Sequence, residues 1–153
     1  MATFELSRST RIDADPARVH ALVDDFHAWQ QWSPWEDLDP DQSRSYSGPD
    51  RGVGAHYEWS GNRKAGAGSM EITESRPDAV VIDLRFTKPF KAENVTRFDL
   101  APAGTGTDVT WTLSGERNAV MQLMGKLYFD NAVGKDFEKG LSQLKAAAES
   151  PGA

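Results

Sequence analysis

Hydrophobic and polar residues alternate along most of the chain, first between residues 4 and 12 and then in several runs between residues 43 and 113. Each later run ends at a turn signal, such as Gly48-Pro49 or Gly61-Asn62. A period of two residues is typical of strands that bury one face. The pattern therefore predicts about six or seven strands, in a sheet with one apolar and one charged face.

Two segments follow the helical period instead. Asp15 and Pro16 are an N-cap and a first-turn proline in sequence, and they precede an apolar face formed by Val19, Leu22, Val23 and Phe26. A second helix is expected from Asn118 to about Glu149. Its two apolar stripes are out of phase, which predicts a kink or break near residues 130–134.

The order of these elements is strand, helix, a meander of strands, and one long helix. Hairpins without alternating strand–helix units indicate an α+β domain with an antiparallel sheet. The C-terminal helix is the only predicted element long enough to cover the apolar face. With 153 residues, the chain fits one domain, which we place at residues 1–149, followed by a disordered tail at residues 150–153.

Composition narrows the classes of function. The formal net charge of −6 argues against a nucleic-acid partner, and the absence of cysteine excludes disulfides, zinc thiolate sites and thiol catalysis. We find neither a signal-peptide pattern nor an apolar run of about 18 residues, the length that would span a bilayer. The expectation is a cytoplasmic protein without integral membrane association.

Motifs for metal, cofactor or nucleophilic chemistry are not found in the sequence. The three histidines lack ligand spacing, and no serine lies in a nucleophile elbow. The acidic run around residues 36–41 does not have the pattern of a calcium loop, because Pro40 interrupts it and no glutamate closes it. We predict no metal, no cofactor and no assigned catalytic residue.

Aromatic residues provide the strongest remaining signal. Three of the five tryptophans, Trp29, Trp32 and Trp35, lie within seven residues beside Pro34. They either plug one end of the core or wall a ligand cavity. The inward parity of the sheet also collects many aromatic and aliphatic side chains, together with Glu74, Asn94 and Thr96. A buried Asn or Thr needs a partner, which is the backbone, water or a ligand oxygen.

Four stretches resemble the START-like superfamily, which has the helix-grip fold, and in particular the bacterial polyketide cyclase/dehydrase-like (SRPBCC) proteins. They are WSPWEDLDP at Trp32–Pro40, YSGPDRGVGAHYEWSGN at Tyr46–Asn62, FTKPF at Phe86–Phe90 and MGKLYFDNAVGKDFEKGLSQLK at Met124–Lys145. The resemblance covers Thr3 to Glu149. It implies a curved sheet gripping the long helix, with a cavity between them.

The resemblance and the aromatic inner face together suggest a binding or carrier protein for an apolar small molecule, lipid-like or aromatic. One alternative is a polyketide cyclase or dehydratase, for which Tyr57, Glu74, Asn94 and Thr96 are the available polar groups. Another is a ligand-free interaction module of the chaperone-activator kind. A protein partner is not predicted from the sequence. The predicted ligand-binding residues are Trp32, Trp35, Tyr57, Trp59, Met70, Ile72, Leu84, Phe86, Asn94, Phe98, Trp111, Met121, Met124, Leu127 and Phe137.

Overall fold

Seven antiparallel strands form one sheet in the order β1-β7-β6-β5-β4-β3-β2. The structure, a computed structural model, describes residues 2–35, 39, 41–62, 65–88, 91–117 and 130–150. The strands are β1 (Ala2–Ile12), β2 (Ser43–Ser47), β3 (His56–Ser60), β4 (Ala67–Arg76), β5 (Ala79–Lys88), β6 (Ala92–Ala103) and β7 (Gly106–Arg117). The predicted antiparallel sheet of six or seven strands is confirmed.

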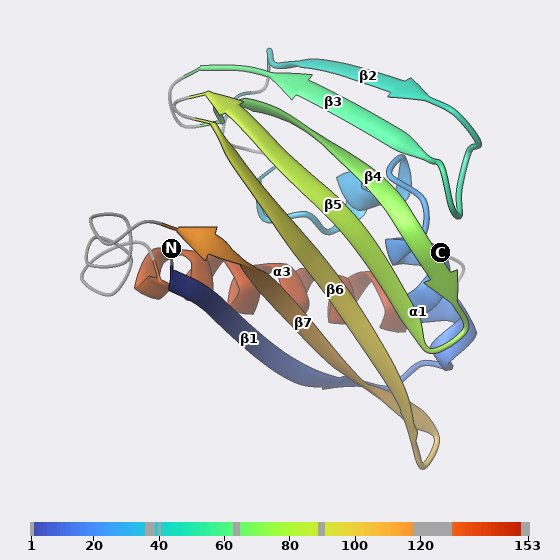
Figure 1. The fold of residues 1–153 in the computed structure, drawn as a ribbon. Coiled ribbons are helices and arrows are strands. Elements are labelled where there is room, and N and C mark those ends of the chain that lie inside the picture. The colour runs from blue at the N-terminus through green and yellow to red at the C-terminus, as the bar shows by residue number, and fades with distance from the viewer. Residues whose placement is uncertain are drawn as a thin grey trace.

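The sheet is curved, and its helices lie on the concave side (Figure 1). They are α1 (Pro16–Val23), the 3₁₀ turn η1 (Ala28–Gln31) and α3 (Asp130–Glu149). The helix-grip α+β fold predicted from the sequence is therefore confirmed. Helix α3 is uninterrupted from Asp130 onward, so the predicted break does not lie within residues 131–134. The stretch 118–129 lies outside the described residues.

Helix α1 has only eight residues, and two tryptophans complete its C-terminal end. The last carbonyl groups of a helix have no partner within the helix and must be satisfied from outside. The indole N–H of Trp32 donates to the carbonyl of Leu22, and that of Trp29 donates to the carbonyl of Val23, each at 2.8 Å. Tryptophans gathered at residues 29–35 thus supply the donors that a short helix lacks.

The segment that follows η1 packs closely on α3 through a helical glycine. A Cβ atom at Gly140 would lie 2.8 Å from Cζ3 of Trp111 and 3.0 Å from Cδ of Pro34. The amide of Gln143 also donates to the carbonyl of Trp32 at 3.0 Å. Glycine costs about 1 kcal/mol relative to alanine within a helix, and here it permits the Pro34 segment and β7 to approach α3 closely.

Two sequence expectations need correction, and both concern strand phase. The alternation of Val53, Ala55, Tyr57 and Trp59 in the sequence predicts a strand with Val53 facing inward, but Val53 is 59% exposed. Gly52 and Gly54 on either side have positive φ angles of 80° and 95°, which keep this stretch in a loop, so β3 begins only at His56. Glu74 was expected to point inward, but it is exposed because an irregularity between Ile72 and Glu74 shifts the register of β4.

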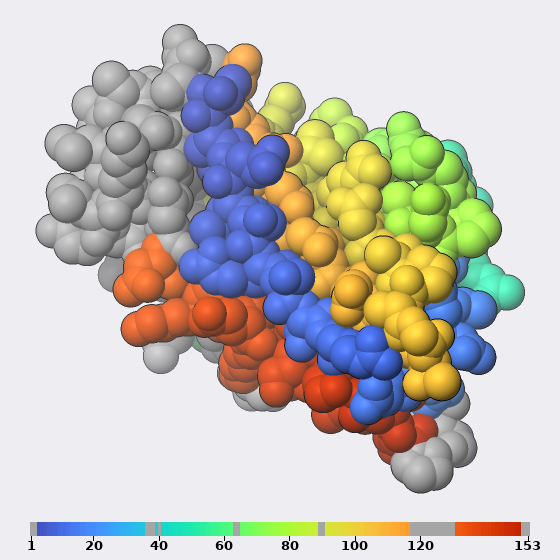
Figure 2. Space-filling model, turned by 90° about the horizontal axis from the view of Figure 1, so that it is seen from below, coloured from blue at the N-terminus to red at the C-terminus, as the bar shows by residue number. Residues whose placement is uncertain are grey.

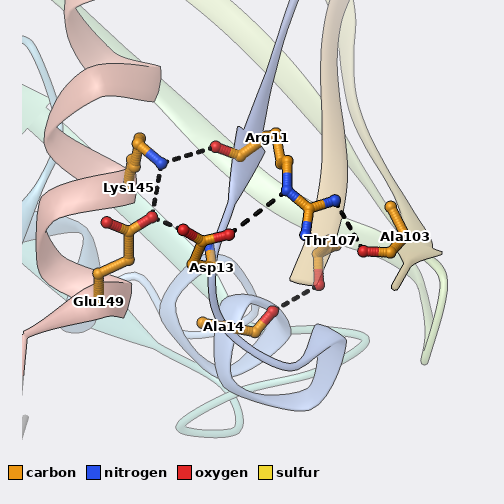
Figure 3. A network of polar contacts seen from close by, with 7 residues as sticks. All are labelled: Arg11, Asp13, Ala14, Ala103, Thr107, Lys145 and Glu149. Atoms are coloured by element: carbon orange, nitrogen blue, oxygen red, sulfur yellow. Dashed lines mark hydrogen bonds and ion pairs between the residues drawn. The ribbon is translucent and has the colours of Figure 1, made fainter. Parts of the chain in front are cut away.

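Strand β1 and helix α3 run side by side, as the view from below shows (Figure 2). Polar contacts tie the ends of these elements together (Figure 3). The Lys145 ammonium donates to the carbonyl of Arg11 at 3.0 Å and to the Glu149 carboxylate at 2.6 Å. The backbone N–H of Asp13 donates to the same carboxylate at 2.8 Å. The first strand is thus joined to the last turn of the last helix.

Candidate ligand-binding face

The centre of the concave side is filled by a cluster of aromatic rings, which we call the aromatic core: Trp29, Trp32, Phe98, Trp111 and Phe137. All five are at most 3% exposed. The Phe137 ring of α3 stacks on Trp111 of β7 with centroids 3.9 Å apart, and Phe98 stacks on the same indole at 4.8 Å. Rings in direct contact leave no room for a ligand between Trp111 and Phe137.

Burial decreases along the inner face of the sheet toward the ends of β3, β5 and β6 that lie away from α1. Ile72 and Ile82 are 0% exposed. The next inward-facing residues on the same two strands, Met70 and Leu84, are 7% and 8% exposed. Trp59, Phe86 and Asn94 are half-buried. We call this region the wing face and define it as Tyr57, Trp59, Met70, Leu84, Phe86 and Asn94.

Aromatic rings line the wing face in a connected row. Tyr57 and Trp59 stack with centroids 6.1 Å apart, and Phe86 meets Trp59 edge-on at 5.8 Å. The Trp59 indole N–H donates to the carbonyl of Ala65 at 2.9 Å, which fixes the orientation of the ring. A Cβ at Gly68 would lie 2.7 Å from Cη2 of Trp59, so the glycine makes room for the indole.

Trp35 links the aromatic core to α3 and is half-buried. Its indole N–H donates to the Asp136 carboxylate at 3.2 Å. Its ring meets Trp111 edge-on at 5.5 Å and Phe137 at 6.3 Å. Trp35 therefore differs from Trp29 and Trp32, whose rings are buried and whose donors cap α1.

The two polar side chains predicted on the inner face of β6 differ in their hydrogen bonding. The Thr96 hydroxyl donates to the carbonyl of Thr112 at 3.1 Å and accepts the indole N–H of Trp111 at 2.7 Å. Thr96 is therefore satisfied within the protein. Asn94 lies between Leu84 on β5 and Gly115 on β7, on the wing face.

The structure brings only part of the predicted site together. Tyr57, Trp59, Met70, Leu84, Phe86 and Asn94 share the wing face, whereas Trp32, Ile72, Phe98, Trp111 and Phe137 belong to the closely packed interior. Ligand contacts by the second group stay predictions. Met121, Met124 and Leu127 lie outside the described residues.

The polar groups weighed for a cyclase or dehydratase do not converge. Glu74 is exposed and pairs with Arg76 at 3.6 Å, while the Thr96 hydroxyl is engaged in the core. Among the side chains that the structure describes, no group of three or more His, Asp or Glu residues is placed to hold a metal ion.

Two residues that contact the site were not predicted from the sequence. Tyr46 of β2 extends the aromatic row, with its ring centroid 5.2 Å from that of Tyr57. Gly115 faces Asn94 across the β6–β7 pair. The alternation of serine with larger residues along β2 could have indicated Tyr46. Gly115 has no side-chain signal, and only the strand register places it beside Asn94.

A small pocket of about 150 Å³ lies at the opposite end of β2 and β3. It is lined by Phe26, His27, Tyr46, Ser47, Gly48, Pro49, Asp50, Ala55 and His56. Its volume is below the range of about 300–1,000 Å³ typical of sites for drug-sized ligands, and α3 contributes none of its lining residues. The predicted cavity between sheet and α3 is a separate feature and stays a prediction.

The fold and the aromatic concave face define a helix-grip domain. The family model described as polyketide cyclase / dehydrase and lipid transport matches residues 3–149. The chain therefore belongs to this family, as its resemblance to the SRPBCC proteins predicted. No curated protein matches the sequence.

Solved structures support the same fold. The Aha1 dimer from Colwellia psychrerythraea is similar at a TM-score of 0.70 and 18% identity, covering 98% of this chain and 99% of that chain. Protein CV1439 from Chromobacterium violaceum is similar at a TM-score of 0.66 and 24% identity, covering 98% of this chain and 99% of that chain. Protein SA2116 from Staphylococcus aureus, of unknown function, is similar at a TM-score of 0.73 and 12% identity, covering 97% of this chain and 94% of that chain. Within the described part of the chain, no helix is long and apolar enough to cross a membrane.

Proposed function

We propose that this protein binds or carries an apolar small molecule, lipid-like or aromatic, on the wing face. The observation that carries the proposal is the loss of cover along the inner face, where the aromatic side chains of Trp59 and Phe86 are half-buried. Contact between large apolar rings and water is unfavourable. A ligand that covers the rings removes them from water and lowers the free energy.

Two further observations support the proposal. The wing-face rings are held in place by contacts within the protein, so little side-chain entropy is lost when a ligand covers them. The description of the family includes lipid transport, which agrees with an apolar ligand. A cytoplasmic location and the absence of a nucleic-acid partner form part of the proposal.

The five indole N–H groups provide a direct test, because each tryptophan has a different environment. We expect naphthalene, used as a small apolar probe, to shift the ¹H–¹⁵N indole signal of Trp59, which is half-buried beside Phe86. The signal of Trp29, which is 3% exposed and capped on Val23, should stay in place. Single Trp→Phe variants assign the signals.

Either of two results would overturn the proposal. In the first, naphthalene leaves the Trp59 signal unchanged at saturating concentration. In the second, all five indole signals move together, which would indicate partial unfolding and not occupation of the wing face.

A further inference from the structure

Asn94 is the only amide side chain on the wing face as we define it, and its surroundings are specific. Its strand neighbours are Leu84 on one side and Gly115 on the other. A Cβ atom at Gly115 would lie 2.5 Å from Oδ1 of Asn94, so the carboxamide extends over the glycine. The absence of a side chain at residue 115 leaves the space that the carboxamide occupies.

The hydrogen-bonding capacity of Asn94 is unused within the described residues. Its neighbour on the same face of β6, Thr96, both donates to Thr112 and accepts from Trp111. The carboxamide of Asn94 makes no hydrogen bond to any residue that the structure describes. It can offer two donors and an acceptor oxygen, and it is half-buried, so a molecule on the wing face can reach it.

Charge on the inner face restricts what that molecule can be. The strand row through Asn94 contains Tyr57, Met70, Leu84 and Gly115. The adjacent row contains Trp59, Gly68, Phe86 and Ala92. The row through Asn94, which Tyr46 of β2 extends, carries no charged side chain, whereas the adjacent row continues from Trp59 to Arg44 on β2, four strands away from Asn94 on β6. A carboxylate placed beside Asn94 would lose its hydration without gaining a counter-charge from the side chains of its row, which is costly.

We propose that Asn94 determines ligand specificity by hydrogen bonding to a neutral hydroxyl or carbonyl group of an otherwise apolar ligand. This inference rests on the proposed function and names the class of ligand: neutral and mainly apolar, with one such polar group. Pure hydrocarbons leave the carboxamide unpaired, and a fatty or aromatic acid bound at Asn94 brings a charge that no side chain of the Asn94 row balances.

Three probes of one shape test the inference: naphthalene, 2-naphthol and 2-naphthoate, which is an anion at pH 7. Dissociation constants are measured from the Trp59 indole signal. We expect 2-naphthol to bind about two- to tenfold more tightly than naphthalene, the gain of one net hydrogen bond. 2-Naphthoate should bind most weakly. In Asn94→Leu, the ratio of the naphthol and naphthalene constants should approach one, while naphthalene still binds.

Thr96→Val is the matched control, because it removes a hydroxyl from the same face of the same strand whose bonds are already satisfied. Its ratio should equal that of the wild type. If naphthalene fails to bind the wild type, both the proposed function and this inference are overturned. If naphthalene binds but naphthol has no advantage, or the advantage survives in Asn94→Leu, only the inference is overturned. If 2-naphthoate binds most tightly of the three probes, the inference is likewise overturned and the proposed function is not.

Discussion

At the scale of single residues, the tryptophans divide by the partner of their indole N–H. Trp29 and Trp32 donate to helix carbonyls inside the core, whereas Trp35 donates to a carboxylate on α3 and Trp59 to a loop carbonyl. The first pair has a structural role, because it completes α1. Trp59 is half-buried and belongs to the wing face, where we propose that a ligand binds.

Trp32→Phe should destabilise the fold by about 1–3 kcal/mol, because it retains a large ring but leaves the buried carbonyl of Leu22 without a donor. Trp35→Phe is the matched comparison. It loses a bond to Asp136, which water can replace at a half-buried position, so its cost should be about 1 kcal/mol or less. Urea unfolding of both variants measures the difference, and equal costs would contradict the capping role of Trp32.

Residue-level reasoning from the sequence identified these aromatics but not their partners. Parity along β3–β6 correctly grouped the wing-face residues, because alternation is a local property of a strand. The same parity could not separate Trp59 from Trp111, since burial depends on which helix covers which part of the sheet. It failed at Glu74, where a register shift reversed the phase.

At the scale of elements, the two buried glycines of α3 face different neighbours. A Cβ at Gly140 would meet the Trp111 ring and the ring of Pro34, both of which are fixed by packing. The three atoms nearest to a Cβ at Gly134 would all belong to the guanidinium of Arg8, the far end of a flexible side chain. Glycine is unfavourable in a helix to the same extent at both positions. Only at Gly134 can the neighbouring side chain move to make room for a methyl group.

Gly140→Ala should therefore destabilise the protein by about 1–3 kcal/mol through overpacking. Gly134→Ala should be neutral or stabilising by up to about 1 kcal/mol, because alanine has the higher helix propensity and Arg8 can move aside. Thermal unfolding of the two variants gives the comparison. A stabilising Gly140→Ala would show that α3 does not approach β7 as closely as described.

Elements were more predictable than their ends. Strand alternation and the Asp15-Pro16 start of α1 are local signals, and both are found in the structure. A strand extended through Val53 was a wrong prediction, because Gly52 and Gly54 have positive φ angles that keep this stretch in a loop. The loop is held by a hydrogen bond from the Gly52 N–H to the carbonyl of Asp24, a residue distant in sequence. Such long-range contacts leave no periodic trace in the sequence.

At the scale of the whole molecule, the contacts in Figure 3 connect segments that are distant in sequence. The Glu149 carboxyl has a lowered pKa, first because Lys145 donates a hydrogen bond to it and then because the backbone N–H of Asp13 does. Its pKa in the folded state is therefore below the ordinary value of 4.5. The stabilisation from this carboxylate is present above about pH 4.5 and is lost as the pH falls through the folded pKa.

The variant Glu149→Gln tests this linkage. The difference in unfolding free energy between wild type and variant should be largest at neutral pH and should shrink progressively below about pH 4.5. Because the group is exposed, added salt should reduce the difference. Urea unfolding between pH 3 and pH 7 measures it. A difference that stays constant across this range would contradict an electrostatic role for Glu149.

The pairing of β1 with β7 sets an order for folding during synthesis. Ala2 pairs with Arg117 and Ile12 with Thr107, so β1 is synthesised before β2 to β6 but gains its neighbour in the sheet only when β7 follows them. The hairpins from β2 to β6 join strands that follow one another and can pair as they emerge. The nascent chain therefore assembles the hairpins that carry the wing face first, and β1 is among the last strands to be incorporated into the sheet.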